Sequence, residues 1–168
     1  RPDVIQKNIE ELSLPCCPEI VDSHDFSKHE EYAKAYNKLR DRKGVTLEIA
    51  RKRVRDANIL GLMKVKMGEA DAFISGLTFE YPDVIKPALR IHRTAPGTTR
   101  AAGVYLMIVD DRVYLFTDAT VNINPTAEDL AEIALLAADY AKQLEIEPRV
   151  AFLSFSNFGS PPHPESNK

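Results

Sequence analysis

The sequence contains very little cysteine. Only two cysteines occur in 168 residues, and they are adjacent, at Cys16 and Cys17. Neighbouring cysteines rarely bond to each other, because the disulfide strains the peptide between them. The sequence therefore excludes a disulfide-rich secreted scaffold and favours a reducing cytoplasm.

Histidine is also scarce and predicts no metal centre. None of the four histidines stands at ligand spacing from a cysteine or from a second histidine on one helix face. We therefore expect no metal ligands among His24, His29, His92 and His163.

Long apolar runs and a strong charge of one sign are absent as well. No apolar stretch approaches the length of a membrane span, and the N-terminal residues lack the apolar run of a signal peptide. The formal net charge of −3 gives no general attraction to nucleic acid or to anionic membranes. The chain does not begin with Met, so we expect it to be part of a longer protein.

The first half of the chain predicts helices with short buried strands between them. Ser27 with Glu30 has the pattern of a capping box, and Gly44 and Thr46 mark one helix end and the next helix start. The helices are expected at 28–43, 46–56, 58–70 and 81–94, and the strands at 19–22 and 71–76. Pro82 suits a first helical turn, whereas Pro87 is expected to kink the last helix.

The second half begins at the clearest break in the sequence, TAPGTT at 94–99. A β-hairpin is predicted at 103–118, because two β-branched and aromatic runs flank Asp110-Asp111. A helix at 126–144 and a strand at 149–156 follow. Alternating helices and hydrophobic strands predict the α/β class.

The helix at 126–144 has the strongest sequence signals. Thr126 is predicted to be its N-cap, and Asp129 stands where the acid of a capping box belongs. Small apolar residues form a stripe along it. These are Leu130, Ile133, Ala134, Ala137 and Ala141.

One candidate for anion binding is the run from Lys38 to Arg55, which is positively charged in a chain whose net charge is negative. It could hold a nucleotide or a phosphate, but composition alone favours a solvated helix face. Another is the turn SFSNFGS at 154–160, whose hydroxyls and backbone N–H groups could face an anion. It lacks the Lys-Ser/Thr pair of a Walker motif, and an ordinary strand-to-helix connection is favoured.

Two smaller features are open to structural interpretations. Ser75-Gly76 closes a predicted strand, where Gly76 would allow a tight turn. Asn122 and Asn124 are expected to cap the next helix rather than to bind a ligand. The residues by themselves thus indicate an anion-binding α/β domain with no identified nucleophile, base or metal.

Six stretches, taken in order, resemble one known family. They are RKGVTLEIAR, MGEADAFISG, KPALRIHRTAPG, GVYLMIVDD, TDATVNINPTAEDLAEIA and EPRVAFLSFSNFGS. In this order they are similar to the phosphate acetyl/butyryltransferase family. The forms NFGS and GLT…YPD resemble one branch, the phosphotransacetylase-like C-terminal domain of large bacterial NADP-dependent malic enzymes.

The resemblance implies a two-lobed phosphotransacetylase or isocitrate dehydrogenase-like fold in α/β/α layers, with its ligand between the lobes. The first lobe would take in 1–95, and the start of the second would take in 96–168. Both lobes would be incomplete in these residues and would expose apolar surface. Acetyl-CoA or CoA is the implied ligand. NADP and Mg²⁺ or Mn²⁺ would bind only to another domain of the parent malic enzyme.

The resemblance also implies a binding set, with no catalytic residue and no metal ligand. Arg40 and Lys86 match cleft positions of the family, although Lys86 stands where the family usually has Arg, and a Lys lacks the bidentate fork. The implied ligand-binding residues are Arg40, Lys43, Lys86, Ser75, Gly76, Ser156, Asn157, Gly159 and Ser160. We expect three places, near 40, near 86 and at 156–160, to face one crevice.

Three functional hypotheses follow from the resemblance. The first is a regulatory acyl-CoA-binding domain of a malic enzyme that converts malate to pyruvate and CO2, with the catalytic domain of that enzyme as partner. The second is an active acyltransferase that converts acetyl-CoA and phosphate to acetyl phosphate and CoA. The third is an oligomerisation module that uses the small-residue stripe of 126–144. Self-association into a dimer or larger assembly is expected.

Overall fold

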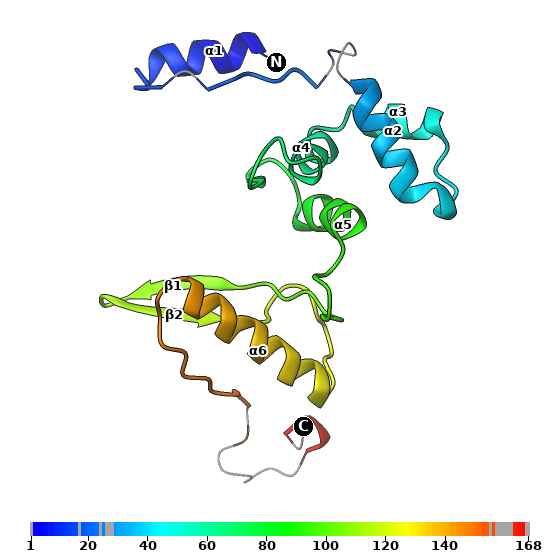
Figure 1. The fold of residues 1–168 in the computed structure, drawn as a ribbon. Helices are drawn as coiled ribbons and strands as arrows, with labels where there is room; N and C mark the ends of the chain where they lie inside the picture. The colour runs from blue at the N-terminus through cyan, green and yellow to red at the C-terminus, as the bar shows by residue number, and fades with distance from the viewer. Residues whose placement is uncertain are drawn as a thin grey trace. The chain divides into compact units, whose positions relative to one another are not determined.

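The computed structural model divides the chain into two compact units, Arg1–Arg93 (unit 1) and Thr94–Lys168 (unit 2) (Figure 1). This division lies two residues from the expected boundary at 95. The structure describes residues 2–16, 18–23, 25, 29–154, 156 and 163–166.

The regular secondary structure described in unit 1 is helical. Its elements are α1 (Pro2–Glu11), α2 (His29–Arg40), the 3-10 turn η1 (Asp41–Lys43), α3 (Leu47–Arg53), α4 (Ala57–Lys66) and α5 (Tyr81–Ile91). The predicted helices therefore exist, with ends shifted by a few residues. Pro87 lies inside α5, and the expected cap Ser27 lies outside the described residues.

The helix-end signals predicted at Gly44 and Thr46 are confirmed, and Asp56 adds a cap that was not predicted. Gly44 follows η1 with φ of 76°, a left-handed conformation that glycine adopts without a steric penalty. The Thr46 hydroxyl accepts a hydrogen bond from the Ile49 N–H at 3.3 Å, which caps α3. The Asp56 carboxylate caps α4 by accepting from Asn58 N–H at 2.9 Å and Ile59 N–H at 3.0 Å.

The core of unit 1 forms where α2 packs against α3 and α4, and where α4 packs against α5. Ala33 on α2 and Ala50 on α3 are fully buried, and small side chains of this kind allow helices to approach closely. The largest fully buried side chains are Tyr36, Met63, Ile91 and Val54. Each contributes about 1.5–3 kcal/mol by burial, enough together to close a small helical core.

Gly61 on α4 provides space for an aromatic ring. A Cβ at this position would lie 2.3 Å from Cε2 of Phe73, closer than any van der Waals contact. Phe73 is half-buried and packs against the core. Phe73, seven residues beyond the end of α4, therefore packs on this helix at the position where residue 61 has no side chain.

The two strands expected in unit 1 are not strands in the structure. Residues 19–22 and 71–76 have no strand partner among the described residues. Ile74, expected to be buried, is 94% exposed. A strand needs a neighbour to satisfy its backbone N–H and C=O groups, and apolar character alone does not supply one.

Unit 2 contains the predicted hairpin, formed by β1 (Tyr105–Val109) and β2 (Arg112–Phe116). The strands are antiparallel, with Tyr105 opposite Phe116 and Val109 opposite Arg112. Asp110 and Asp111 form the two-residue turn, and both have positive φ, of 47° and 61°. A tight hairpin turn requires this conformation, and Asp tolerates it better than most residues do.

The long helix of unit 2 is α6, Ala127–Gln143. Its capping box is confirmed: the Thr126 hydroxyl accepts from Asp129 N–H at 3.2 Å, and the Asp129 carboxylate accepts from Thr126 N–H at 3.0 Å. The apolar stripe is confirmed as the buried face, because Ile133, Ala137 and Ala141 are buried. A short 3-10 turn, η2 (Pro164–Ser166), lies near the end of the chain.

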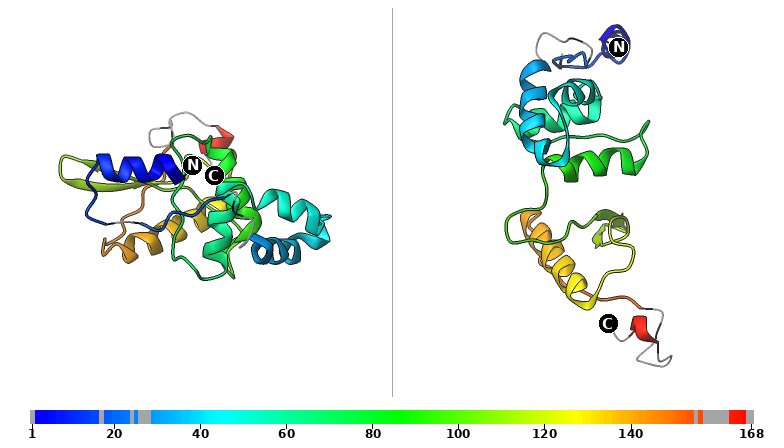
Figure 2. Two further views of the ribbon diagram at one scale, coloured as in Figure 1. Left: turned by 90° about the horizontal axis from the view of Figure 1, so that it is seen from above. Right: turned by 90° about the vertical axis from the view of Figure 1, so that its right-hand side faces the viewer.

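The expected strand at 149–156 is another correction. Residues 149–154 are coil, and the described part of the chain contains a single two-stranded sheet (Figure 2). Phe152 and Leu153 are 66% and 88% exposed. The apolar run therefore has the composition of a buried strand but no strand beside it.

Candidate functional site

Arg40, the main predicted phosphate ligand, is the last residue of α2. Its side chain is half-buried, and its Nε is buried without a hydrogen-bond partner in the described structure. Buried polar atoms of proteins are nearly always paired. The Nε–H of Arg40 is therefore a hydrogen-bond donor that is available to a ligand. Its place at a helix C-terminus also gives Arg40 a structural role, because cations stabilise that end of the helix dipole.

Lys43 lies three residues further, in η1, and is exposed. Lys86 is exposed on α5. Within the described residues, no hydrogen bond or ion pair joins Arg40, Lys43 or Lys86 to any of the others. Arg40 and Lys43 share one turn of the chain, but the structure shows no link between that turn and Lys86.

The rest of the basic run is largely engaged within unit 1. Arg51 binds the Glu30 carboxylate with both arms of its guanidinium, at 2.8 and 2.7 Å, and this hydrogen bond holds the pKa of Glu30 below its usual value. Arg53 donates to the Tyr36 hydroxyl at 3.2 Å. These contacts support the solvated-face interpretation for the α3 part of the run.

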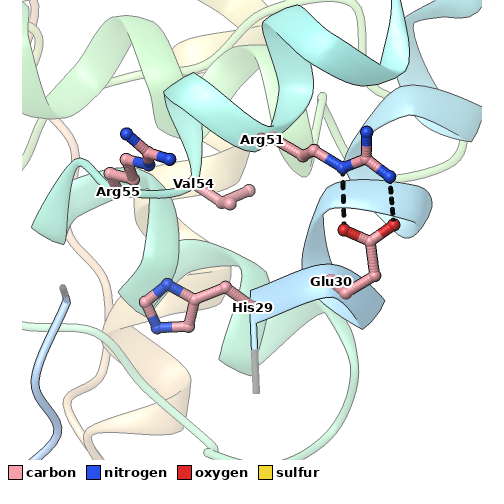
Figure 3. A pocket seen from close by; sticks show the side chains of 5 residues that line it. All are labelled: His29, Glu30, Arg51, Val54 and Arg55. Carbon is pink, nitrogen blue, oxygen red and sulfur yellow. Dashed lines mark hydrogen bonds and ion pairs between the residues drawn. The ribbon is translucent and has the colours of Figure 1, made fainter. Parts of the chain in front are cut away.

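A small pocket opens beside this ion pair, between the start of α2 and the end of α3 (Figure 3). Its volume is about 140 Å³, and it is lined by His29, Glu30, Arg51, Val54 and Arg55. Because Glu30 already occupies the guanidinium of Arg51, the pocket does not present that fork to a bound anion. It is also far smaller than a typical ligand pocket of several hundred Å³.

Ser75 and Gly76 form a turn held against the start of α4. The Ser75 hydroxyl donates to Oδ1 of Asn58 at 2.6 Å, and Asn58 is almost completely buried. Gly76 has φ of 144°, a conformation that side chains rarely adopt. The Ser75 hydroxyl proton is thus committed to Asn58, and the carbonyl oxygen of the half-buried Gly76 accepts from Thr78 N–H at 2.6 Å.

A second polar cluster in unit 1, which the sequence did not reveal, joins α2 to α4 and to the turn that follows α4. The Tyr32 hydroxyl donates to Glu69 at 2.7 Å, and the Lys64 ammonium donates to the same carboxylate oxygen at 2.9 Å. Burial and the Glu69 hydrogen bond raise the pKa of Tyr32, while the Glu69 hydrogen bond raises the pKa of Lys64. The cluster connects α2 to the end of α4.

Asp118 is the most heavily hydrogen-bonded carboxylate described in unit 2. It accepts from the backbone N–H groups of Gly103, Thr120, Val121 and Asn122, at 2.8–3.1 Å, and from the Asn122 side chain. Partial burial alone would raise its pKa, but these hydrogen bonds outweigh burial and lower the pKa from 3.8 to about 2.

The sequence led us to expect that Asn122 caps α6, and this expectation is wrong. Its side-chain amide donates to Asp118 and to the Ala101 carbonyl at 2.9 Å, and Thr126 provides the cap. The loop after β2 is tied by these bonds to the segment before β1. No pattern in the sequence distinguishes an Asp that gathers several N–H groups from one in an ordinary turn.

The start of unit 2 is clamped to α6 by two acids. The Glu132 carboxylate accepts from Thr99 N–H at 2.6 Å, from the Thr99 hydroxyl and from Arg100 N–H at 3.2 Å. The Arg100 guanidinium donates to Asp129 at 2.7 Å. The hydroxyl and N–H of Thr99 hold the pKa of Glu132 below its usual value, so the clamp persists at neutral pH.

The predicted turn at 156–160 is described only at Ser156. Its N–H donates to the Ser154 hydroxyl at 2.9 Å, and its own Oγ is buried without a partner in the described structure. Asn157, Gly159 and Ser160 lie outside the described residues. Ser156 belongs to unit 2, whereas Arg40, Lys43, Ser75, Gly76 and Lys86 belong to unit 1, so a shared crevice stays a prediction.

Comparison with known families gives a match over residues 4–168 to phosphate acetyl/butaryl transferase. The chain belongs to this family. The predicted family is thereby confirmed, since the match spans almost the whole sequence and not only the six stretches that indicated it.

Individual relatives carry the same name. The chain is 40% identical to a phosphate acetyltransferase of Bacillus subtilis, with 98% of this chain and 51% of that protein covered. It is 40% identical to one of Clostridium acetobutylicum, with 93% and 49% covered. The chain thus spans about half the length of these relatives.

Solved structures give the same result for the fold. A phosphotransacetylase from Streptococcus pyogenes matches with a TM-score of 0.85 and 37% identity, covering 98% of this chain and 50% of that one. The EutD phosphotransacetylase from Staphylococcus aureus matches with a TM-score of 0.82 and 32% identity. The α/β phosphotransacetylase fold is confirmed.

The malic-enzyme interpretation is wrong. Relatives at about 40% identity are named phosphate acetyltransferase, which favours the alternative hypothesis over a regulatory domain. The NFGS and GLT…YPD forms did not distinguish the branches. Because they depended on this interpretation, three further expectations are unsupported as well: NADP, a malic-enzyme partner and a divalent metal in another domain.

Among the described residues, no three His, Cys, Asp or Glu side chains gather as ligands for a metal ion. None of the helices in the described ranges has both the length and the apolar character needed to cross a bilayer.

Proposed function

We propose that this chain is part of an acyltransferase that interconverts acetyl-CoA and phosphate with acetyl phosphate and CoA. The observation that carries the proposal is the 40% identity to phosphate acetyltransferase over almost the whole chain. A phosphate oxygen attacks the thioester carbonyl, a C–O bond forms, the C–S bond breaks, and the CoA thiolate leaves and takes up a proton.

Within this reaction, we assign the described basic residues to binding of anionic groups. Arg40 offers a buried, unpaired Nε–H, and Lys43 adds an exposed ammonium one turn further along. Lys86 is a third cation without an ion-pair partner in the described structure. Guanidinium and ammonium groups bind phosphates through charge-assisted hydrogen bonds, and the acyl donor and acceptor of this reaction both carry phosphate groups.

The turn elements fit binding through backbone and hydroxyl groups. Gly76 presents a backbone without a Cβ, and nothing lies within 4 Å of the place where one would be. Ser156 has a buried Oγ without a described partner, and Asn157, Gly159 and Ser160 follow it in the predicted turn. We propose these residues, with Ser75 fixing the Gly76 turn, as the lining of the acyl-CoA site.

The test is an assay of CoA release from acetyl-CoA in a family-length protein that carries these 168 residues. Sustained, phosphate-dependent turnover is expected. Arg40→Ala should lower kcat/KM by about 10- to 100-fold, the effect of losing one hydrogen bond to a charged group.

Arg42→Ala is the matched control, because Arg42 is an exposed neighbour in η1. Its kcat/KM should stay within about twofold of the parent value. A protein that folds but releases no CoA when phosphate is added contradicts the proposal. Equal losses of kcat/KM in Arg40→Ala and Arg42→Ala contradict the phosphate-binding role of Arg40, but they do not contradict the acyltransferase activity.

A further inference from the structure

The connection between α4 and α5, residues 67–80, carries the Gly76 turn (Figure 1). Two contacts anchor it to α4. The Phe73 ring packs where Gly61 has no side chain, and the Ser75 hydroxyl donates to Oδ1 of Asn58 at 2.6 Å. Within the described part of the chain, this is the one hydrogen bond that ties residues 71–79 to another element.

The spacing of the two anchors on the helix matches their spacing on the connection. Asn58 and Gly61 are three residues apart on α4, so they share a face at about 5–6 Å. Phe73 and Ser75 are two residues apart, and such side chains of an extended segment point to the same side at roughly 6–7 Å. Ile74 between them is 94% exposed, as this alternation requires. The segment 73–75 therefore lies along α4.

Asn58 is a fixed partner for this segment. It is only 2% exposed, and the Asp56 carboxylate that caps α4 accepts from its backbone N–H at 2.9 Å. Leu62 and Met63 hold the same helix in the core of unit 1. A buried amide oxygen without a hydrogen bond is costly, so the bond to Ser75 restrains the connection and also satisfies Asn58.

We propose that Asn58 is a positioning residue for the acyl-CoA site and acts through the Ser75 hydroxyl on the Gly76 turn. This rests on the proposed function, in which that turn lines the site. Asn58 does not touch the ligand, because its side chain is almost completely buried. Binding groups keep their geometry when hydrogen bonds behind them hold them on a rigid element, and α4 is that element here.

The test measures steady-state kinetics of Asn58→Leu in a family-length protein that carries these 168 residues. Leucine has a similar volume but no acceptor for the Ser75 hydroxyl. The KM for acetyl-CoA should rise by about 3- to 10-fold, the value of one hydrogen bond, because the turn loses its anchor. The kcat should stay within about twofold, since the turn binds the ligand without reacting.

Tyr32→Phe is the matched control. It removes the 2.7 Å hydrogen bond from the Tyr32 hydroxyl to Glu69, which lies just beyond the opposite end of α4. It should lower the thermal midpoint while KM and kcat stay at the parent values. A KM that is unchanged in Asn58→Leu, or that rises equally in both variants, overturns the proposal, because Asn58 would then serve stability only.

Ser75→Ala removes the same hydrogen bond from the side of the connection and leaves the core of unit 1 intact. It should raise the KM for acetyl-CoA by the same factor as Asn58→Leu. The double variant should show no further rise, because the two changes break one interaction. Factors that multiply in the double variant overturn the proposal, since Asn58 would then act independently of Ser75.

Failure of the proposed reaction is visible separately, in the protein without substitutions. If that protein binds CoA but shows no turnover, the acyltransferase proposal fails. The dissociation constant of CoA, measured by isothermal titration calorimetry, then replaces KM with the same expected factors for each variant. A protein that turns over while Asn58→Leu leaves KM unchanged overturns the role of Asn58 and supports the reaction.

Discussion

The two units differ in how far the described residues complete them. Unit 1 buries Tyr36, Val54, Met63 and Ile91 in a core formed by helices alone. In unit 2, the buried apolar residues described are Ile133, Ala137 and Ala141, all on α6, while the hairpin is exposed. The difference follows from hydrogen bonding, because a helix satisfies its backbone within itself, whereas a strand depends on neighbours.

The contrast between the two units is contradicted if substitutions in the core of unit 1 leave the free energy of unfolding unchanged. Met63→Ala should lower the free energy of unfolding of the 168-residue chain by about 2–5 kcal/mol, because it leaves a cavity in a closed core. Urea unfolding followed by far-UV circular dichroism measures this. The matched variant is Ile108→Ala in unit 2, which should cost less than about 1 kcal/mol because Ile108 is exposed. Equal costs would mean that unit 2 is as closed as unit 1.

The contact between Phe73 and Gly61 gives a second test of how tightly the core of unit 1 is packed. Gly61→Ala should lower the free energy of unfolding by about 1–3 kcal/mol, because the new methyl group displaces the ring despite a better helix propensity. The control is Gly61→Ala with Phe73→Ala, in which the added methyl group should cost nothing further. If Gly61→Ala raises the thermal midpoint, the ring does not lie on α4.

The pH dependence of unit 2 should centre on Asp118. Its pKa is lowered in the folded state, so its stabilising effect is complete above pH 3.8 and is lost as the pH falls towards 2. Asp118→Asn should therefore cost about 1–2 kcal/mol at pH 6 and clearly less at pH 2.5. Free energies of unfolding at both pH values check this. A cost independent of pH would show that the charge is not what holds the loop.

The smallest expected difference lies between the two helix caps. Thr126→Ala should lower the free energy of unfolding by about 1 kcal/mol, because it removes one half of a reciprocal capping box. Thr46→Ala should cost about half as much, since its single hydrogen bond is 3.3 Å long. Thermal denaturation of both variants measures the order. The reverse order would contradict a stronger cap in unit 2.

Local features were predictable from the sequence because their causes are local. Thr46, Thr126, Asp129 and Gly44 act within one helical turn, and the apolar period of α6 places Ile133 on its buried face. Asp110-Asp111 specified the hairpin turn in the same way. The expected lobe boundary at 95 stays a prediction, made because TAPGTT can continue neither a helix nor a strand.

Non-local features were not predictable from these patterns. The runs at 71–76 and 149–154 have the composition of buried strands, but strand formation depends on a partner that no local pattern reveals. The gathering of N–H groups on Asp118 depends on a loop closing onto residues before β1. For the candidate site, sequence indicated Arg40 but not its unpaired Nε, nor that Glu30 occupies Arg51.

The acid clamp on Thr99 and Arg100 has a consequence for movement. Since Glu132 and Asp129 fix these two residues to α6, they travel with that helix as one rigid piece. On the other side, the His92 imidazole is hydrogen-bonded to the Leu62 carbonyl at 3.0 Å and travels with α4. Between these two anchors lies the segment 93–98, in which the Thr98 hydroxyl donates to the Ala95 carbonyl at 2.7 Å.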